Sequence, residues 1–171
     1  MEFTTLIEER HSTRVYQQKP VEQEKLDTIL HAANRAPSAG DLQAYSIVVV
    51  RNSAVCRALA TAAAGQDWLA QAPLVLVFLA EPGRSGVKYG RRGENLYAVQ
   101  DATIACAYAQ LAAHDSGLSA CWVGAFRTRD VQEAVGATEW QVPVALLPIG
   151  YAAESPFITP RRRLSELVRE V

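Results

Sequence analysis

The long apolar stretch at residues 94–116 constrains the fold more than any other segment. Alanines fill the positions between larger side chains that recur at helical spacing: Leu96, Val99, Thr103, Cys106, Tyr108 and Leu111. This spacing predicts one long helix that is apolar on nearly every face. Such a helix is buried on several sides. Since a chain of 171 residues forms a small domain, we expect a partner subunit to cover part of this helix.

Four shorter apolar runs predict strands. Residues 46–50 and 74–79 are continuous, which predicts burial on both faces of each strand. Residues 119–124 and 142–149 supply the third and fourth strands. Further helices are predicted at residues 3–10, 22–35, 53–64 and 128–135. Helices that alternate with buried strands favour a three-layer α/β or α+β sandwich.

The chain is expected to form a single domain over residues 1–171. Its last part, residues 152–171, should be an extended arm with a short helix. Pro156 and Pro160 make the arm too irregular for the core, and apolar side chains then recur at helical spacing at Leu164, Leu167 and Val168.

Composition limits the partners and the compartment. With 17 Lys and Arg against 18 Asp and Glu the net charge is -1, so no overall basic field favours nucleic acid and any anion site must be local. Three cysteines without C-x-x-C spacing argue against a disulfide framework or a zinc cluster. No run approaches the roughly 18 apolar residues of a membrane span, and the first residues contain no apolar signal core. We therefore expect a cytoplasmic protein.

Common catalytic motifs are missing. The sequence contains no G-x-S-x-G, H-E-x-x-H, G-x-x-x-x-G-K or G-x-G-x-x-G, which disfavours a Rossmann or P-loop nucleotide site. The three histidines have no ligand-like spacing, so no metal site is predicted. Cys121 could in principle be a thiol nucleophile, but a cysteine in an apolar strand is usually inert packing.

Two arginine-rich segments form a candidate anion site. Arg10, Ser12 and Arg14 follow the first predicted helix, and two guanidinium groups with a hydroxyl suit a phosphate. Arg161 and Arg163 are two residues apart and would face the same way in an extended segment. The alternative is that both segments are solvated arginine clusters.

Two other segments are rich in residues that break helices. Residues 36–43, with the sequence A-P-S-A-G-D-L-Q, would fix backbone shape and turn main-chain groups outward, which suits a rigid planar ligand. Residues 81–93 are expected to form a mobile loop, in which glycines separate four cations: Arg84, Lys88, Arg91 and Arg92. That loop is either a solvated linker or, functionally, a lid or a contact to a nicotinamide-nucleotide phosphate.

Five motifs in order carry a resemblance to a known family. They are R-H-S-T-R, P-S-A-G-D-L-Q, G-L-S-A-C-W-V-G-A-F, P-I-G-Y and R-R-R-L-S-E-L. With these motifs the chain resembles the nitroreductase family of FMN-dependent oxidoreductases, particularly its short members. The resemblance implies an α+β three-layer sandwich whose central, mostly antiparallel sheet is flanked by helices. It also implies an intertwined homodimer, with the long helix in the interface and each FMN site built from both subunits.

The resemblance also implies site residues by position. The FMN phosphate and ribityl end would be held by Arg10, His11, Ser12, Arg161 and Arg163. Arg14 would reach the pyrimidine side of the flavin and tune its reduction. The other subunit would border the flavin with Pro37, Ser38 and Ala39, and with Gln43 nearby. The opposite edge would be lined by Trp122, Val123 and Gly124.

This chain departs from the family pattern at two positions. Asp41 stands where the family commonly has Asn, and Ala44 where Pro commonly follows Gln. A carboxylate at position 41 accepts hydrogen bonds but cannot donate them as an amide does. Any contact of this position to flavin or substrate is therefore expected to change.

The implied activity is hydride transfer from NADH or NADPH to flavin N5, and then to a nitroaromatic, a quinone or a similar small acceptor by a ping-pong mechanism. No catalytic side chain is expected, because the flavin carries the chemistry. Two alternatives stay open: another flavin chemistry on the same scaffold, such as dehydrogenation or dehalogenation, and a non-catalytic flavin-binding module. The sequence does not distinguish NADH from NADPH.

Overall fold

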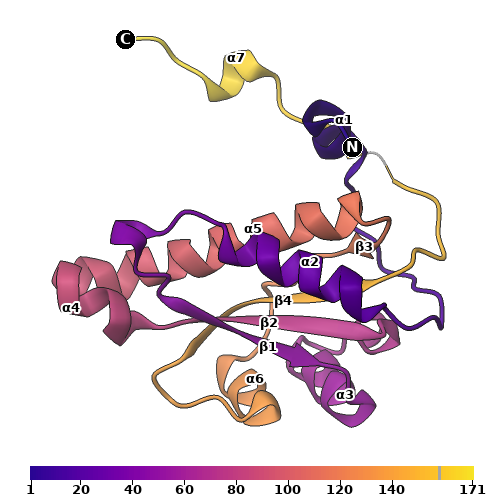
Figure 1. Ribbon diagram of the computed structural model, residues 1–171, viewed down its shortest axis with the longest axis horizontal. Coiled ribbons are helices and arrows are strands. Elements are labelled where there is room, and N and C mark those ends of the chain that lie inside the picture. The colour runs from indigo at the N-terminus through magenta and orange to yellow at the C-terminus, as the bar shows by residue number, and fades with distance from the viewer. Residues whose placement is uncertain (158) are drawn as a thin grey trace.

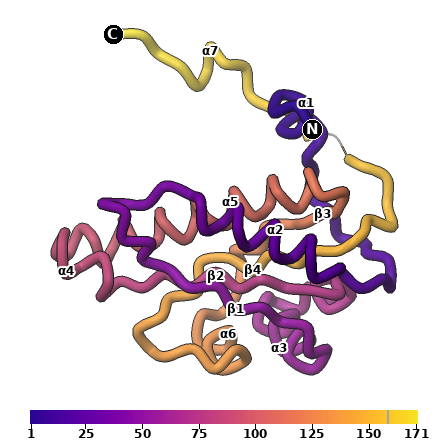
Figure 2. The backbone as a smooth tube through the Cα atoms, in the orientation of Figure 1, coloured from indigo at the N-terminus to yellow at the C-terminus, as the bar shows by residue number. Residues whose placement is uncertain are grey.

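The computed structural model describes residues 1–157 and 159–171. Its core is a sheet with helices on both faces, which confirms the predicted three-layer α+β sandwich (Figures 1 and 2). The strands are β1 (Tyr45–Val50), β2 (Leu74–Ala80), β3 (Ser119–Ala120) and β4 (Val142–Gly150). The α-helices are α1 (Phe3–Glu9), α2 (Gln23–Asn34), α3 (Ser53–Ala62), α4 (Pro82–Arg92), α5 (Ala98–Asp115), α6 (Thr128–Val135) and α7 (Leu164–Leu167).

The strands lie in the order β1-β2-β4-β3, and every neighbouring pair is antiparallel. As predicted, β2 is buried along its whole length. The prediction that residues 46–50 are buried on both faces is wrong, because β1 is an edge strand and Val49 is 38% exposed. A continuous apolar run does not show whether a strand has one neighbour or two.

The third strand is shorter than predicted. Only Ser119 and Ala120 pair continuously with β4, and Val123 then makes an isolated bridge to Leu146. The backbone N–H of Cys121 donates to the carbonyl oxygen of Pro148 at 3.4 Å. Since proline has no N–H to donate in return, the ladder between β3 and β4 is interrupted there.

The two helical layers divide the side chains of β2 between them. Leu76 and Phe78 pack with α2 and α5 on one face, where Ile29 and Ala105 are fully buried. The alternate residues of β2 pack with α3 and α6 on the other face, as the two-residue period of a strand requires. Figure 1 shows α2 and α5 above the sheet and α3 and α6 below it.

The prediction of a mobile loop at residues 81–93 is wrong. Residues 82–92 form α4, and a π-helical turn, η3 (Gly93–Tyr97), connects it to α5. Gly90 has a φ of 54°, which reverses the chain direction between the helical segments. A Cβ at Gly93 would lie 2.5 Å from the carbonyl oxygen of Ser85. These glycines therefore provide a sharp turn and a close helix contact.

The predicted long helix is confirmed as α5. Its alanine-rich face packs on the sheet, and its opposite face carries residues that are partly or fully exposed within one chain: Gln100, Thr103, Ile104, Ala107, Tyr108 and Leu111. The C-terminal arm extends away from the sheet and carries α7 (Figure 1). Within residues 1–157 and 159–171, no helix has both the length and the apolar character needed to cross a membrane.

Candidate functional site

The basic segment at residues 10–14 runs beside β3. Ser12 forms a parallel bridge with Ala120, and the N–H of Thr13 donates to the carbonyl oxygen of Ala120 at 3.3 Å. The buried hydroxyl of Tyr16 donates to the carbonyl oxygen of Thr13 at 2.7 Å. The segment is therefore fixed to the sheet, next to the predicted residues that follow β3.

Arg10 and Arg161 bring two positive charges close together. Burial lowers the pKa of the Arg10 guanidinium, and the charge of Arg161 lowers it further. Arg161 belongs to the C-terminal arm and is exposed, so charges far apart in the sequence act on each other here. Like charges held together in a partly buried place are unfavourable unless an anion compensates them.

Three buried polar atoms near Arg10 have no hydrogen-bond partner in the described part of the chain: Nε2 of His11, Oγ1 of Thr13 and Nε2 of His114. The other ring nitrogen of His11, Nδ1, lies 3.0 Å from the carbonyl oxygen of Glu9. The His11 ring meets His114 edge to face, with ring centroids 6.2 Å apart. Buried polar atoms are usually hydrogen-bonded, so this segment has capacity for a further polar group.

The backbone of Arg14 is held by a carboxylate that the sequence did not single out. Glu154 accepts hydrogen bonds from the N–H groups of Arg14 and Val15. The Arg14 guanidinium lies over the ring of Trp68, 5.8 Å from its centroid. These contacts fix the backbone of Arg14 and leave its guanidinium exposed.

The residues predicted to line the opposite flavin edge follow β3 directly. Val123 is buried, and its N–H donates to the carbonyl oxygen of Leu146 at 2.9 Å. Trp122 is half-buried and Gly124 is exposed beside its indole. Burial raises the pKa of the Cys121 thiol even though Arg14 and other neighbours lower it, which favours packing over a nucleophilic role.

The structure does not bring Arg163 to Arg10 within one chain. The Arg163 guanidinium instead lies 3.1 Å from the Glu166 carboxylate within α7, and Arg162 lies 3.5 Å from the same carboxylate. All three side chains are exposed on the arm. Exposed ion pairs of this kind contribute little and rearrange readily.

A second group of predicted residues lies on the loop at 37–43. The φ angles of Gly40, Asp41 and Gln43 are 60°, 59° and 46°. The Ser38 hydroxyl accepts from the N–H of Gln43 at 3.0 Å and closes the loop. Since Asp and Asn both tolerate positive φ better than most residues, Asp41 can replace the usual Asn without changing the backbone.

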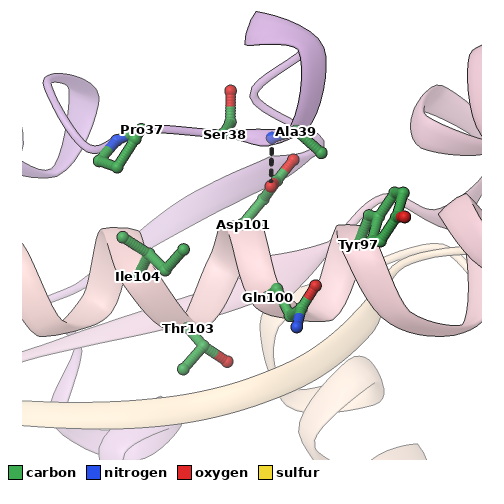
Figure 3. A pocket seen from close by; sticks show the side chains of 8 residues that line it. All are labelled: Pro37, Ser38, Ala39, Tyr97, Gln100, Asp101, Thr103 and Ile104. Atoms are coloured by element: carbon green, nitrogen blue, oxygen red, sulfur yellow. Dashed lines mark hydrogen bonds between the residues drawn. The ribbon is translucent and has the colours of Figure 1, made fainter. Parts of the chain in front are cut away.

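Asp101 of α5 holds this loop, and sequence reasoning missed it. The carboxylate is only 2% exposed. Oδ1 accepts from the N–H of Ala39 at 2.9 Å, and Oδ2 accepts from the N–H of Ala44 at 3.2 Å. Figure 3 shows the side chain pointing from the helix to the loop. The available signal was a carboxylate in the middle of an apolar helix, where a charge must have a buried partner.

A pocket of about 460 Å³ opens between the loop and α5. It is lined by Pro37, Ser38, Ala39, Tyr97, Gln100, Asp101, Thr103 and Ile104 (Figure 3). Three of the predicted flavin-bordering residues therefore lie together at a pocket. Tyr97 adds an aromatic ring that the sequence did not indicate as part of a site.

The two groups lie at opposite ends of α5. Asp101 marks the loop end, and His114, which meets His11, marks the basic end. At 1.5 Å per residue, these positions are about 20 Å apart along the helix. One chain therefore keeps the two groups of predicted residues apart.

Comparison with known proteins identifies the family. The model of the nitroreductase family matches residues 7–66 and 57–151. The NADH dehydrogenase of Thermus thermophilus is 31% identical over 98% of this chain and 95% of its own length. The FMN reductase [NAD(P)H] of Bacillus subtilis is 30% identical over 91% of this chain and 68% of its own.

A solved structure agrees with these relatives. The FMN-dependent nitroreductase from Clostridium difficile superposes with a TM-score of 0.81 and 28% identity, and the match covers 92% of each chain. The fold, the sequence and the ordered motifs therefore lead to one conclusion: this chain belongs to the nitroreductase family.

Proposed function

We propose that this protein is an FMN-dependent oxidoreductase that takes hydride from NADH or NADPH and passes it to a small acceptor, such as a nitroaromatic or a quinone. Membership of the nitroreductase family supports the proposal. The observation that carries it is the basic segment at residues 10–14, which is fixed beside β3 and has buried polar atoms without partners in the described chain.

The basic cluster fits the phosphate end of FMN. A phosphate carries up to two negative charges and several strong acceptor oxygens. Between Arg10 and Arg161 it would remove their repulsion, and it could accept hydrogen bonds from the Ser12 hydroxyl and, with the His11 ring doubly protonated, from Nε2 of His11. Arg163, with a side chain that is 83% exposed, would complete the site from the same arm.

Bound FMN would supply the centre that accepts and donates hydride. The side chains of this protein would bind and orient it. Trp122, Val123 and Gly124 would line one edge, and Arg14 would place a positive charge on the pyrimidine side, where reduction adds negative charge. Nucleotide and acceptor would use the same slot in turn, which gives a ping-pong order.

We take the basic cluster around Arg10 and the loop at 37–43 as two half-sites. Their separation along α5 favours a homodimer. The loop at 37–43 of one chain would meet the basic cluster of the other, so that each pair of half-sites binds one flavin. The incompletely buried face of α5, with Ile104 and Ala107, would supply the contact between chains. Leu164 and Leu167 on the arm, which are 76% and 58% exposed in one chain, would be covered by the partner.

The test is the visible spectrum of the purified protein after it has been mixed with FMN and separated from unbound flavin. We expect one flavin per chain, and bleaching by NADH or NADPH that is reversed by a quinone or a nitroaromatic. A protein that retains no FMN would overturn the proposal. Flavin that is bound but not bleached by either nucleotide would show another flavin chemistry or a binding module instead.

A further inference from the structure

Two cations of α4 lie against the loop at 37–43. Arg84 and Lys88 are four residues apart on α4 and therefore lie on one face of the helix. Nε of Arg84 donates to the carbonyl oxygen of Leu42 at 2.5 Å. A Cβ at Gly40 would lie 2.6 Å from Nζ of Lys88 and would overlap the Tyr89 hydroxyl. This face of α4 therefore packs directly on the loop that borders the pocket.

A pair of tyrosines, Tyr89 and Tyr97, connects this basic surface to the pocket. Tyr89 and Tyr97 meet edge to face, with centroids 5.1 Å apart. Arg92 lies over Tyr97, 5.4 Å from its centroid, and its Nε donates to the Tyr97 hydroxyl at 2.9 Å. Tyr97 itself lines the pocket, and in Figure 3 it lies toward the Ala39 end, away from Pro37. Cations and aromatic rings are therefore in contact with one another next to the pocket.

These cations lack carboxylate partners. In the part of the chain that the structure describes, no acidic group lies within 4.0 Å of a basic nitrogen of Arg84, Lys88, Arg91 or Arg92. The loop contributes the exposed carboxylate of Asp41, next to Gly40. Glu94 lies against Gly86 of α4, so Asp41 and Glu94 offset the positive charge of this surface only in part. Guanidinium and ammonium groups around aromatic rings suit a phosphate attached to an aromatic base.

From this arrangement we infer that α4 and Tyr97 form the subsite for the adenosine end of the reduced nucleotide, and that its cations select NADPH over NADH through the 2′-phosphate. This inference rests on the proposed function. A nucleotide whose nicotinamide reaches the slot must extend its other half across a wall of the pocket. Next to the pocket, α4 carries the cations that a further phosphate requires, and the tyrosine pair, of which Tyr97 lines the pocket, offers a surface for the adenine.

Steady-state kinetics with both nucleotides test the inference, using FMN-loaded protein and a quinone acceptor. The double variant Lys88→Gln/Arg91→Gln spares Arg84 and Arg92, which bind the loop and Tyr97. We expect wild-type kcat/KM to be about tenfold or more higher for NADPH, and the ratio to fall about tenfold in the variant. Asp41→Asn should raise the ratio, because it removes a negative charge. Arg57→Gln/Arg129→Gln, on the opposite helical layer, is the matched control and should leave the ratio unchanged.

Inhibition by nucleotide fragments provides a second readout. Adenosine 2′,5′-bisphosphate should compete with NADPH more strongly than 5′-AMP, and the difference should disappear in Lys88→Gln/Arg91→Gln. Equal use of NADH and NADPH by the wild type, or a ratio that the double variant does not change, would overturn the inference while leaving FMN binding and turnover intact. Failure to bind FMN would instead overturn the proposed function.

Discussion

The carboxylate of Asp101 accepts a hydrogen bond from the N–H of Ala39 at 2.9 Å, across the wall of the pocket. Its second oxygen accepts from the N–H of Ala44 at 3.2 Å, so one buried side chain holds both ends of a loop with three positive φ angles. The regular structure of this loop is one short 3-10 turn, η1 (Ala39–Asp41), which is too short to fix the conformation of the whole loop. The geometry of the pocket therefore depends on a residue that lies on α5.

Replacing Asp101 with Asn should loosen the loop. An amide keeps one acceptor oxygen but turns an NH2 group toward the second backbone N–H, which loses its partner. We expect the free energy of unfolding to fall by about 1–3 kcal/mol, and FMN affinity to fall at least about tenfold. Urea denaturation and FMN titration measure the two effects. Asp67→Asn, at an exposed position, is the control. If both variants had the same free energy of unfolding and the same FMN affinity, Asp101 would not position the loop.

Arg10→Gln should weaken FMN binding without lowering the stability of the flavin-free protein. Loss of this cation should weaken FMN binding by roughly tenfold or more. The flavin-free protein should unfold at the same or a higher temperature, because the repulsion between Arg10 and Arg161 is removed. Equilibrium dialysis and calorimetry measure these quantities, with Arg129→Gln as a control. A purely structural role for Arg10 would give the opposite result, a lower unfolding temperature with unchanged FMN affinity.

Acidification should destabilise the folded protein at the contact between His11 and His114. Burial lowers the pKa of His114, and the His11 ring lowers it further; Arg10 acts in the same direction, while Glu9 and Asp115 oppose it. Because the folded-state pKa lies below the unfolded value near 6.5, the unfolded chain binds more protons and stability falls as pH drops through that range.

The pH effect is measured by comparing unfolding free energies at neutral pH and near pH 5. His114→Gln should lose less stability on acidification than the wild type. The exposed His31→Gln should lose as much stability as the wild type does. If His114→Gln followed the same pH dependence as His31→Gln, the assignment to His114 would be incorrect.

Ala107→Glu tests the exposed face of α5. Ala107 is exposed in one chain, so the subunit should fold normally, but a carboxylate buried between two copies would be costly. We expect light scattering to give the mass of a monomer, with FMN binding lost as well. Ala58→Glu, an equally simple change on the exposed surface of α3, should stay dimeric. If both variants were dimers, the exposed face of α5 would not form the contact between the two chains.

The helices, the strands and the long central helix could be predicted from local pattern, because each is specified by the spacing of apolar residues along the chain. The errors arose where tertiary neighbours decide the outcome. The run at residues 46–50 does not reveal that β1 has a single neighbour, and Pro148 shortens β3 from across the sheet. The glycines of residues 81–93 indicated flexibility, whereas Gly93 permits close packing against Ser85.

The site could be predicted in part. Motifs indicated the arginines and the loop at 37–43, whose role in binding stays a prediction; the structure shows that the charge of Arg161 acts on Arg10 and that Pro37, Ser38 and Ala39 line one pocket. Asp101 and Tyr97 were missed because their importance comes from what they face, not from a local pattern. The separation of the half-sites also required the structure, since it depends on the length of α5.

We propose that each flavin site is built from both chains, and a mixed dimer tests this most directly. Arg10→Gln damages the basic half-site and Asp101→Asn damages the loop half-site, so each variant alone should bind little FMN. After unfolding and refolding of an equal mixture, half of the dimers should be mixed, and each of these has one site with both halves intact. We predict that NADPH-bleachable FMN recovers to about a quarter of the wild-type amount. No gain above the two separate variants would contradict a site shared between chains.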